Sequence, residues 1–278
     1  MARLAADGWN VIAAARRPPE ATLDACIEHT PAQITSDEGN ASAGASTRPG
    51  LTRGAAPQDG STRGASTQGK SRLGVVTGPR LRRGDFVACD VADAGQVRAL
   101  FAHIRQRFGR LDALVTAAGI AGPNPLDGDD DATWHAIIGS NLHGTYHCCK
   151  AALPLLPDQT GRIVTIASVL GLRGVPDQTA YCAAKHGVVG FTRALALAMA
   201  PRGITVNAIC PGWTDTEMAR SRFADLGITG EDAASHMPTG RIVAPAEVAD
   251  TVAWLLRPET SSLTGHALPL DGGGLALP

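Results

Sequence analysis

The sequence has few aromatic residues, almost no net charge and no long apolar run. Aromatic residues make up 4% of the 278 residues, although apolar residues make up 44%. A core of alanine, valine, leucine and isoleucine is typical of parallel strands covered by helices. The formal net charge of −1 argues against a nucleic-acid or anionic-membrane partner, which a basic field would attract. No apolar run reaches the ~18 residues that span a bilayer, and none at the N-terminus resembles a signal peptide.

Cysteine is present, but not in the pattern of a metal or disulfide site. The six cysteines form no CxxC pair and have no histidine at a spacing suited to zinc. Most lie in apolar stretches, where cysteine packs as a small hydrophobic residue. We therefore expect no metal, a cytoplasmic location, and ordinary helical roles for the histidines near the motifs described below.

Residues 36–72 differ in composition from the rest of the chain. Leu51 is their only large apolar residue, and "GASTR" and "STRGAST" nearly repeat one another. Such a segment cannot bury enough surface to offset the entropy of ordering. We expect a disordered insertion, a spacer or a tethered regulatory tail, within one domain that spans residues 1–278.

From Asp85 onward, strand and helix patterns alternate. This alternation, with near-continuous apolar strands, predicts an α/β fold with a doubly wound, Rossmann-like parallel sheet. Ligands in that architecture bind beyond the carboxyl ends of the strands. The expected strands are 85–91, 111–119, 161–168, 204–210 and 267–273, and the expected helices are 93–109, 132–156, 180–200 and 246–256.

Three polar residues predict acid–base chemistry at that edge. Tyr181 and Lys185 are four positions apart on a predicted helix, so their side chains share one face. A lysine ammonium one turn away favours the phenolate and would lower the pKa of the tyrosine from ~10. Ser168 ends an apolar strand, where its hydroxyl would face the same pocket. A serine donor and a tyrosine acid at one oxygen suit carbonyl reduction or its reverse, whereas a YxxxK pair alone also fits an exposed helix.

Four motifs in fixed order extend this pattern. They are "NLHGT" with Asn141, "GRIVTIASVLGLRG" with Ser168, "YCAAKHG" with Tyr181 and Lys185, and "ITVNAICPGWTDTEM". Together they resemble the short-chain dehydrogenase/reductase family, of the kind that includes 3-oxoacyl carrier-protein reductases. The resemblance covers residues 1–17 and 85–278.

The resemblance implies a role for each catalytic position. Tyr181 would be the general acid/base, and Lys185 would lower its pKa and hold the nicotinamide ribose. Ser168 would orient the substrate carbonyl. Asn141 would hold a water that links Lys185 to bulk solvent, although an asparagine there could also simply brace helix backbone.

The resemblance also implies where a nicotinamide cofactor lies. The implied residues are Asp90 and Val91 beside the adenine, Ala117, Ala118 and Gly119 along the adenosine, Pro211, Gly212 and Thr214 at the nicotinamide, and Thr216 near the phosphates. Asp90 could instead be only a helix cap, and proline-glycine after a strand only a turn. Arg16 follows the predicted second strand where an NAD-preferring member carries an aspartate, which favours NADP and leaves NAD open.

Two departures from the family pattern stand out. Thr116 replaces an asparagine that normally ties neighbouring strands together, and we expect threonine to supply one such bond. The family's first strand and glycine-rich phosphate turn are missing before residue 18, so the first 17 residues resemble the end of a helix and the second strand. "VVTG" at 75–78 lacks the later glycines, and we do not assign it as that turn. An upstream start that adds the turn is the alternative.

We therefore predict an NADP(H)-dependent oxidoreductase that interconverts a ketone and a secondary alcohol. The alternative is a catalytically silent subunit with impaired cofactor binding. Residues 213–240 form the expected substrate lid, and a substrate linked to an acyl carrier or coenzyme A stays open. The resemblance implies a homotetramer or homodimer.

Overall fold

The protein is described by a computed structural model over residues 3, 4, 7, 10–15, 72–77, 85–127 and 131–277. These residues build a seven-stranded sheet with the strand order β3-β1-β2-β4-β5-β6-β7. The strands are β1 (Asn10–Ala15), β2 (Arg72–Thr77), β3 (Asp85–Ala88), β4 (Ala113–Thr116), β5 (Arg162–Ile166), β6 (Thr205–Pro211) and β7 (Ala267–Leu270).

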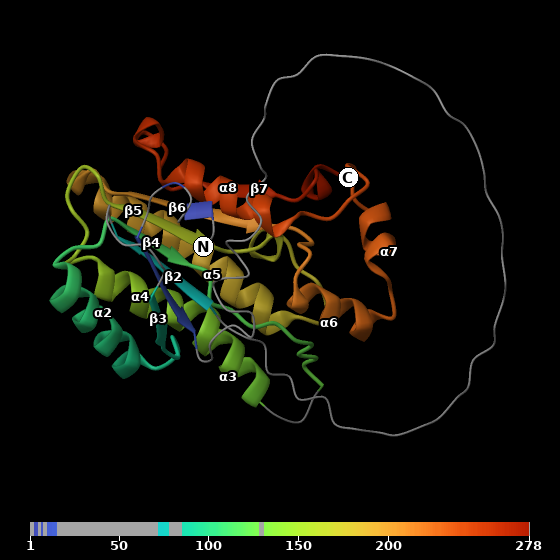
Figure 1. The fold of residues 1–278 in the computed structure, drawn as a ribbon. Coiled ribbons are helices and arrows are strands. Elements are labelled where there is room, and N and C mark those ends of the chain that lie inside the picture. Colours follow the sequence, from blue (N-terminus) through green and yellow to red (C-terminus); the bar gives the residue numbers. More distant parts are fainter. Residues whose placement is uncertain are drawn as a thin grey trace, which may run out of the picture.

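Helices cover both faces of this sheet, which confirms the predicted α/β, Rossmann-like class (Figure 1). One face carries α2, α4 and α5, and the other carries α8. The helices are α2 (Ala94–Phe108), α3 (Ala132–Ile138), α4 (Gly144–Ala152), α5 (Thr179–Met199), α6 (Glu217–Leu226), α7 (Gly230–Ser235) and α8 (Pro245–Leu255). Within the described part of the chain, no helix is long and apolar enough to cross a membrane.

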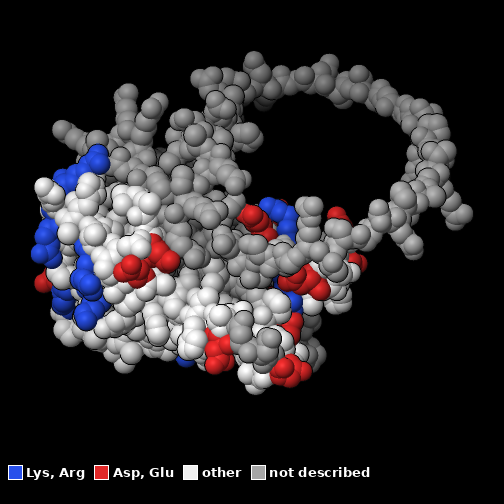
Figure 2. Space-filling model, turned by 90° about the horizontal axis from the view of Figure 1, so that it is seen from below, with Lys and Arg blue, Asp and Glu red and all other residues white. Residues whose placement is uncertain are grey.

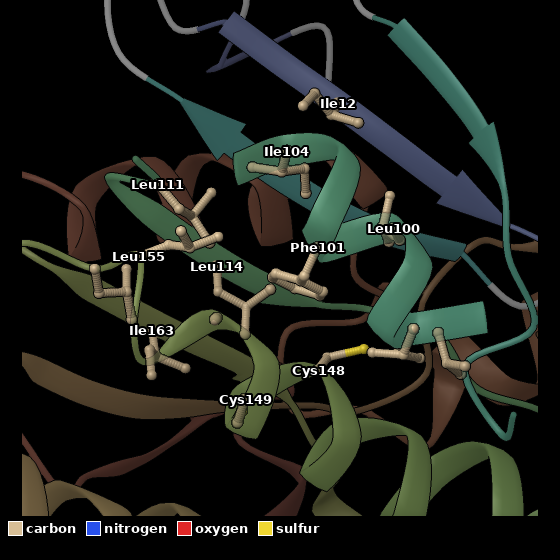
Figure 3. Packing of buried hydrophobic residues seen from close by; sticks show 14 of the residues in the cluster. Ile12, Leu100, Phe101, Ile104, Leu111, Leu114, Cys148, Cys149, Leu155 and Ile163 are labelled. Atoms are coloured by element: carbon tan, nitrogen blue, oxygen red, sulfur yellow. The ribbon is translucent and has the colours of Figure 1, made fainter. Parts of the chain in front are cut away.

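The larger core lies between the sheet and the α2, α4 and α5 face. Figure 3 shows how Ile12 of β1 lies over α2, and how β4, β5 and α4 add their own side chains to the same cluster. Ile104, Leu111, Leu114 and Ile163 are fully buried there. Burying aliphatic side chains of this size contributes roughly 1.5–3 kcal/mol each, so this face holds the strands in place.

α2 shows how the local sequence produces these elements. The carboxylate of Asp93 accepts hydrogen bonds from the first-turn amides, and Gly109 ends the helix in the left-handed conformation at φ 73°. Its buried face consists of Val97, Leu100, Phe101 and Ile104. Asp93, not Asp90, is therefore the cap of this helix.

β2 differs from what the sequence suggests. It lies between β1 and β4 and runs antiparallel to both, whereas the other paired strands are parallel. It takes the place in the sheet where the family's first strand would be, and its direction is reversed. Arg72 therefore pairs with Ala15 at the carboxyl edge of β1, and Thr77 pairs with Asn10 at the opposite edge. The rest of the predicted insertion, residues 36–71, lies outside the described residues and stays a prediction.

Lysine and arginine gather on one side of the face drawn in Figure 2, the side where α2 lies. The last turn of α2 holds Arg105 and Arg107. Because α2 begins after the carboxyl end of β3, this last turn points toward the amino edge of the sheet. Arg105 and Arg107 are thus remote from the edge where the sequence predicts a site.

Candidate active site

The predicted catalytic residues lie together where β5 ends and α5 begins. Lys185 and Tyr181 occupy the first two turns of α5, and the Nζ atom of Lys185 lies 5.5 Å from the centroid of the Tyr181 ring. The same Nζ donates a hydrogen bond of 2.8 Å to the carbonyl oxygen of Ile166, the last residue of β5. Lys185 is only 5% exposed. The end of the central sheet therefore fixes the ammonium beside the tyrosine.

Ser168 reaches the same point from the other side. Its extended backbone follows β5, and its Oγ accepts a 3.1 Å hydrogen bond from the amide of Leu170. Its side chain also acts on Tyr181, where it lowers the pKa of the phenol. The two side chains predicted to act on one substrate oxygen are therefore neighbours.

Gly171 allows this close approach. A Cβ atom at position 171 would lie 2.7 Å from the backbone oxygen of Lys185, and real Cβ atoms essentially never come so close. The turn after Ser168 can pack on α5 only because the residue there is glycine.

Burial changes the expected acid–base properties of this pair. It raises the pKa of Tyr181 to about 12, although the Ser168 side chain acts in the opposite direction. It lowers the pKa of Lys185 from 10.5 to about 8. The expectation from the spacing, a lowered pKa for Tyr181, is therefore wrong for the described chain. Removal from water is the largest cause and outweighs the lowering effect of the Ser168 side chain.

Asn141 stands in a widened stretch of helix. The sequence suggests one helix over residues 132–156, whereas the structure inserts a π-helical segment, Gly139–His143, between α3 and α4. The Asn141 Oδ1 atom accepts from the amide of Ile120 at 2.8 Å, and its Nδ2 atom donates to the Ile120 carbonyl at 2.9 Å. Its side chain thus braces the loop after β4, not helix backbone as the structural alternative expected.

Gly119 brings that asparagine next to the lysine. A Cβ atom at position 119 would lie 3.0 Å from Oδ1 of Asn141 and 3.7 Å from Nζ of Lys185. Both polar atoms therefore border the space left by this glycine. The neighbouring Ala118 is buried, whereas Ala117 is exposed at the carboxyl edge of β4.

The turn after β6 packs tightly on the turn after β7. A Cβ atom on Gly212 would lie 2.9 Å from Cβ of Asp271. The hydroxyl of Thr214 donates to the carbonyl of Gly212 at 3.1 Å. Thr216 caps α6 through a 3.2 Å bond that its Oγ1 accepts from the amide of Ala219. Thr214 and Thr216 thus shape the start of the expected lid, whose helices are α6 and α7.

The remaining predicted cofactor residues follow β3 and β1. Asp90 accepts a 3.1 Å hydrogen bond from the amide of Ala92, and Val91 is 1% exposed. Arg16 lies outside the described residues, next to the last residue of β1. The described residues contain no group of three or more histidine, cysteine or acidic side chains that could hold a metal.

Thr116 does not form the bond expected of it. Its Oγ1 is buried and has no hydrogen-bond partner within the described ranges. In the strand ladder, Thr116 lies opposite Thr165, whose own hydroxyl is bonded to that of Thr192 at 2.8 Å. The hydroxyl of Thr165, which faces Thr116 across the ladder, is therefore already paired with Thr192.

Sequence reasoning missed three residues that hold the site together. Asn124, Asp177 and Arg222 form a chain of contacts from the loop after β4 to α6. They lie in separate segments and share no periodicity, so the sequence carries no signal for them.

Taken together, the fold and the site define a Rossmann-like α/β protein with a serine, tyrosine, lysine and asparagine set at the carboxyl edge of its sheet. The family model described as enoyl-(acyl carrier protein) reductase matches residues 75–274. The chain belongs to the short-chain dehydrogenase/reductase family and resembles its 3-oxoacyl-acyl-carrier-protein reductases.

Individual relatives agree with this assignment. A 3beta-hydroxysteroid dehydrogenase of Mediterraneibacter gnavus is 34% identical over 210 residues, which cover 69% of this chain and 76% of the relative. The 3-oxoacyl-acyl-carrier-protein reductase FabG of Haemophilus influenzae is 38% identical over 195 residues, 69% of this chain and 78% of the relative. The crystal structure of an actinorhodin polyketide ketoreductase variant with NADPH superposes with a TM-score of 0.64 at 38% identity, covering 69% of this chain and 77% of that chain. An oxidoreductase of this family is therefore the functional class.

Proposed function

We propose that this chain uses NADP(H) to interconvert a ketone and a secondary alcohol. The observation that carries the proposal is the position of the buried Lys185 ammonium, 5.5 Å from the centroid of the Tyr181 ring at the end of β5, with Ser168 as a neighbour of the tyrosine. Carbonyl reduction needs a proton donor at the oxygen and a second donor that orients it. These side chains supply both.

Ser168, Tyr181 and Lys185 have different roles at the carbonyl oxygen of the substrate. The nicotinamide, when bound, supplies or accepts the hydride at the carbonyl carbon. Ser168 donates a hydrogen bond to the carbonyl oxygen and orients it. Tyr181 gives its phenolic proton to that oxygen during reduction and takes it back during oxidation. The positive charge on Nζ of Lys185 stabilises the tyrosinate that remains.

The pKa values favour the reduction direction for the free enzyme. With a pKa of about 12, Tyr181 is protonated at neutral pH and ready to donate. Lys185, with a pKa of about 8, is mostly charged at pH 7 and loses its charge at moderately alkaline pH. We expect reductase turnover to fall above pH 8 for this reason.

The described residues leave room for a cofactor at the carboxyl edge of the sheet. Gly119 leaves space beside Lys185 that any side chain would fill, and Ala117 is exposed at the edge of the sheet. Lys185 and Tyr181 would hold the nicotinamide ribose, and the backbone at Thr214 would meet the carboxamide. The NADPH in the related ketoreductase structure supports NADP over NAD, as does the position of Arg16.

The chain provides its own control for the central test. Tyr181→Phe should lower NADPH-linked ketone reduction by ~100-fold or more, because a positioned acid contributes about that much. Tyr146→Phe alters the only other tyrosine of the sequence, which is 43% exposed on α4, and should leave turnover unchanged. Equal turnover in the Tyr181 variant and the wild type would refute the proposed function.

One observation favours a second candidate, a catalytically silent family member with impaired cofactor binding. In the place of the family's first strand, β2 runs antiparallel. The chain therefore enters this strand at the carboxyl edge, instead of leaving it there toward a phosphate-binding turn. A titration with NADPH, followed by fluorescence, separates the two candidates. Binding below millimolar concentration supports the enzyme, and no binding at millimolar cofactor supports the silent subunit.

The proposal extends to the assembly of the chain and to its substrate class. We propose a homodimer or homotetramer, which light scattering would establish, because α4 and α5 expose Tyr146 and Leu197, the latter to 79%.

A 3-oxoacyl thioester, linked to an acyl carrier or coenzyme A, is the first substrate to assay. The five described cysteines are unpaired, in keeping with the reducing cytoplasm that we propose for this chain.

A further inference from the structure

The first turn of α5, which carries Tyr181, is capped by a distant residue. The first amides of any helix lack partners within the helix. Gln178, in the capping position, makes no side-chain hydrogen bond to this turn. Asn124 does so instead, because its Oδ1 accepts from the amide of Ala180 at 3.3 Å and from the hydroxyl of Thr179, 55 positions along the chain, at 2.8 Å.

The backbone of Asn124 is fixed to the same place. Its amide donates to the carbonyl of Asp177 at 2.8 Å, and Thr179 donates to its carbonyl at 3.1 Å. Asn124 is 8% exposed. Because Ile120 is bonded at both polar backbone atoms to Asn141, the segment 120–124 connects that asparagine to the first turn of α5.

Asp177 also binds the lid. Its carboxylate forms an ion pair with Arg222 of α6, whose side chain is 12% exposed. The other carboxylate near this guanidinium is that of Asp225, at 3.9 Å. Figure 1 shows α6 beside one end of α5. A largely buried guanidinium that loses its carboxylate partner is costly, so this pair strongly favours one position of α6.

From these contacts we propose that Arg222 and Asn124 are positioning residues, which fix the first turn of α5 to the place of α6. The Arg222–Asp177 pair holds α6 against the segment before α5, and Asn124 transmits that position to the amides next to Tyr181. A substrate that fixes the position of α6 would thereby also fix the position of the Tyr181 side chain. The consequence for catalysis rests on the proposed function, whereas the mechanical coupling does not.

Amide hydrogen exchange of the full chain tests the coupling without any activity. Arg222→Met should make the segment 178–182 exchange about tenfold faster. The matched control is Arg220→Met, on the same helix. It removes the exposed pair with Asp215, which precedes that helix, with side chains 62% and 56% exposed, and should leave the segment 178–182 as in the wild type. Exchange in the Arg222 variant equal to that in the control would overturn the proposal.

The cap is tested in the same way. Asn124→Leu removes the acceptor at nearly constant volume, and should also speed exchange of the segment 178–182. Asn124→Asp keeps an acceptor at a helix N-terminus, which tolerates negative charge, and should retain protection. If the leucine variant does not fold, the aspartate variant and the comparison of Arg222→Met with Arg220→Met still test the coupling. Loss of protection in Asn124→Asp would contradict it, and so would retained protection in Arg222→Met.

Kinetics then test the consequence for Tyr181. Arg222→Met should lower kcat by about tenfold or more, because small displacements of a catalytic group have large effects on rate, with the KM for NADPH unchanged. A raised substrate KM at unchanged kcat would show that α6 only binds substrate, and would overturn the positioning role. Absence of turnover in the wild type would instead refute the proposed function, and the exchange data would still decide the coupling.

Discussion

Replacing Lys185 by methionine should stabilise the folded chain while it removes activity. Burial lowers the pKa of this lysine from 10.5 to about 8. Each pKa unit corresponds to about 1.4 kcal/mol, so keeping the charged side chain in the folded state costs about 3 kcal/mol at pH 7. Methionine has a similar length and carries no charge. It leaves the carbonyl of Ile166 without its 2.8 Å partner, which costs about 1–2 kcal/mol. The free energy of unfolding of the variant should therefore exceed that of the wild type by about 1–2 kcal/mol.

The dependence on pH identifies the cause. Between pH 8 and 10.5 the unfolded chain binds a proton at this lysine and the folded chain does not. The contribution of Lys185 to the stability of the wild type therefore rises with pH over this range. The methionine variant lacks this contribution, so the difference in stability between the two proteins changes with pH. The advantage of the variant is largest at or below pH 7 and should vanish by pH 10.

Urea denaturation of both proteins at pH 7 and pH 10 measures these differences. Lys150→Met is the control, because Lys150 is exposed on α4, and it should change stability by less than about 0.5 kcal/mol at either pH. A Lys185→Met variant that is no more stable than the wild type at pH 7, with the same difference at pH 10, would refute the reasoning from burial.

Three further substitutions test the packing around the site. Gly171→Ala places a Cβ 2.7 Å from a backbone oxygen of α5 and should destabilise the fold by about 1–3 kcal/mol. Gly174→Ala in the same loop meets nothing within 4 Å and should be neutral when both variants are compared with the wild type by thermal denaturation. Gly119→Ala crowds the site asparagine and lysine and should lower kcat several-fold, whereas Gly122→Ala, with open space around it, should not. Thr116→Val removes a buried hydroxyl without a described partner and should raise the free energy of unfolding by about 1 kcal/mol; a loss of stability would reveal a partner for that hydroxyl.

Local patterns were sufficient for the positions of Tyr181, Lys185 and Ser168. Helix geometry alone places residues four apart on one face, and an apolar strand that ends in serine puts the hydroxyl at the edge of a parallel sheet. The same patterns could not give the pKa values of the pair. Burial sets those values, and burial depends on every element that packs around α5.

The direction of β2 could not be predicted from its local sequence either. "RLGVVT" has the valines and threonine of a strand, but nothing in six residues says which neighbours it joins or in which direction. That choice is made by hydrogen bonds to β1 and β4, which are distant in sequence. Asn124 is a comparable case, since its partners at the start of α5 lie 55 residues away.

By itself, then, the sequence determined the α/β class, the alternation of strands and helices from Asp85 onward, and the positions of Ser168, Tyr181 and Lys185, because these depend on periodicity and short spacing. Asn141 followed only from the resemblance to the family. Tertiary structure alone decided the reversed strand in the centre of the sheet, the raised pKa of Tyr181, and the connection from α6 through Asp177 to the tyrosine. Each of these depends on which distant groups meet and how much water they exclude, and a one-dimensional pattern holds no record of either.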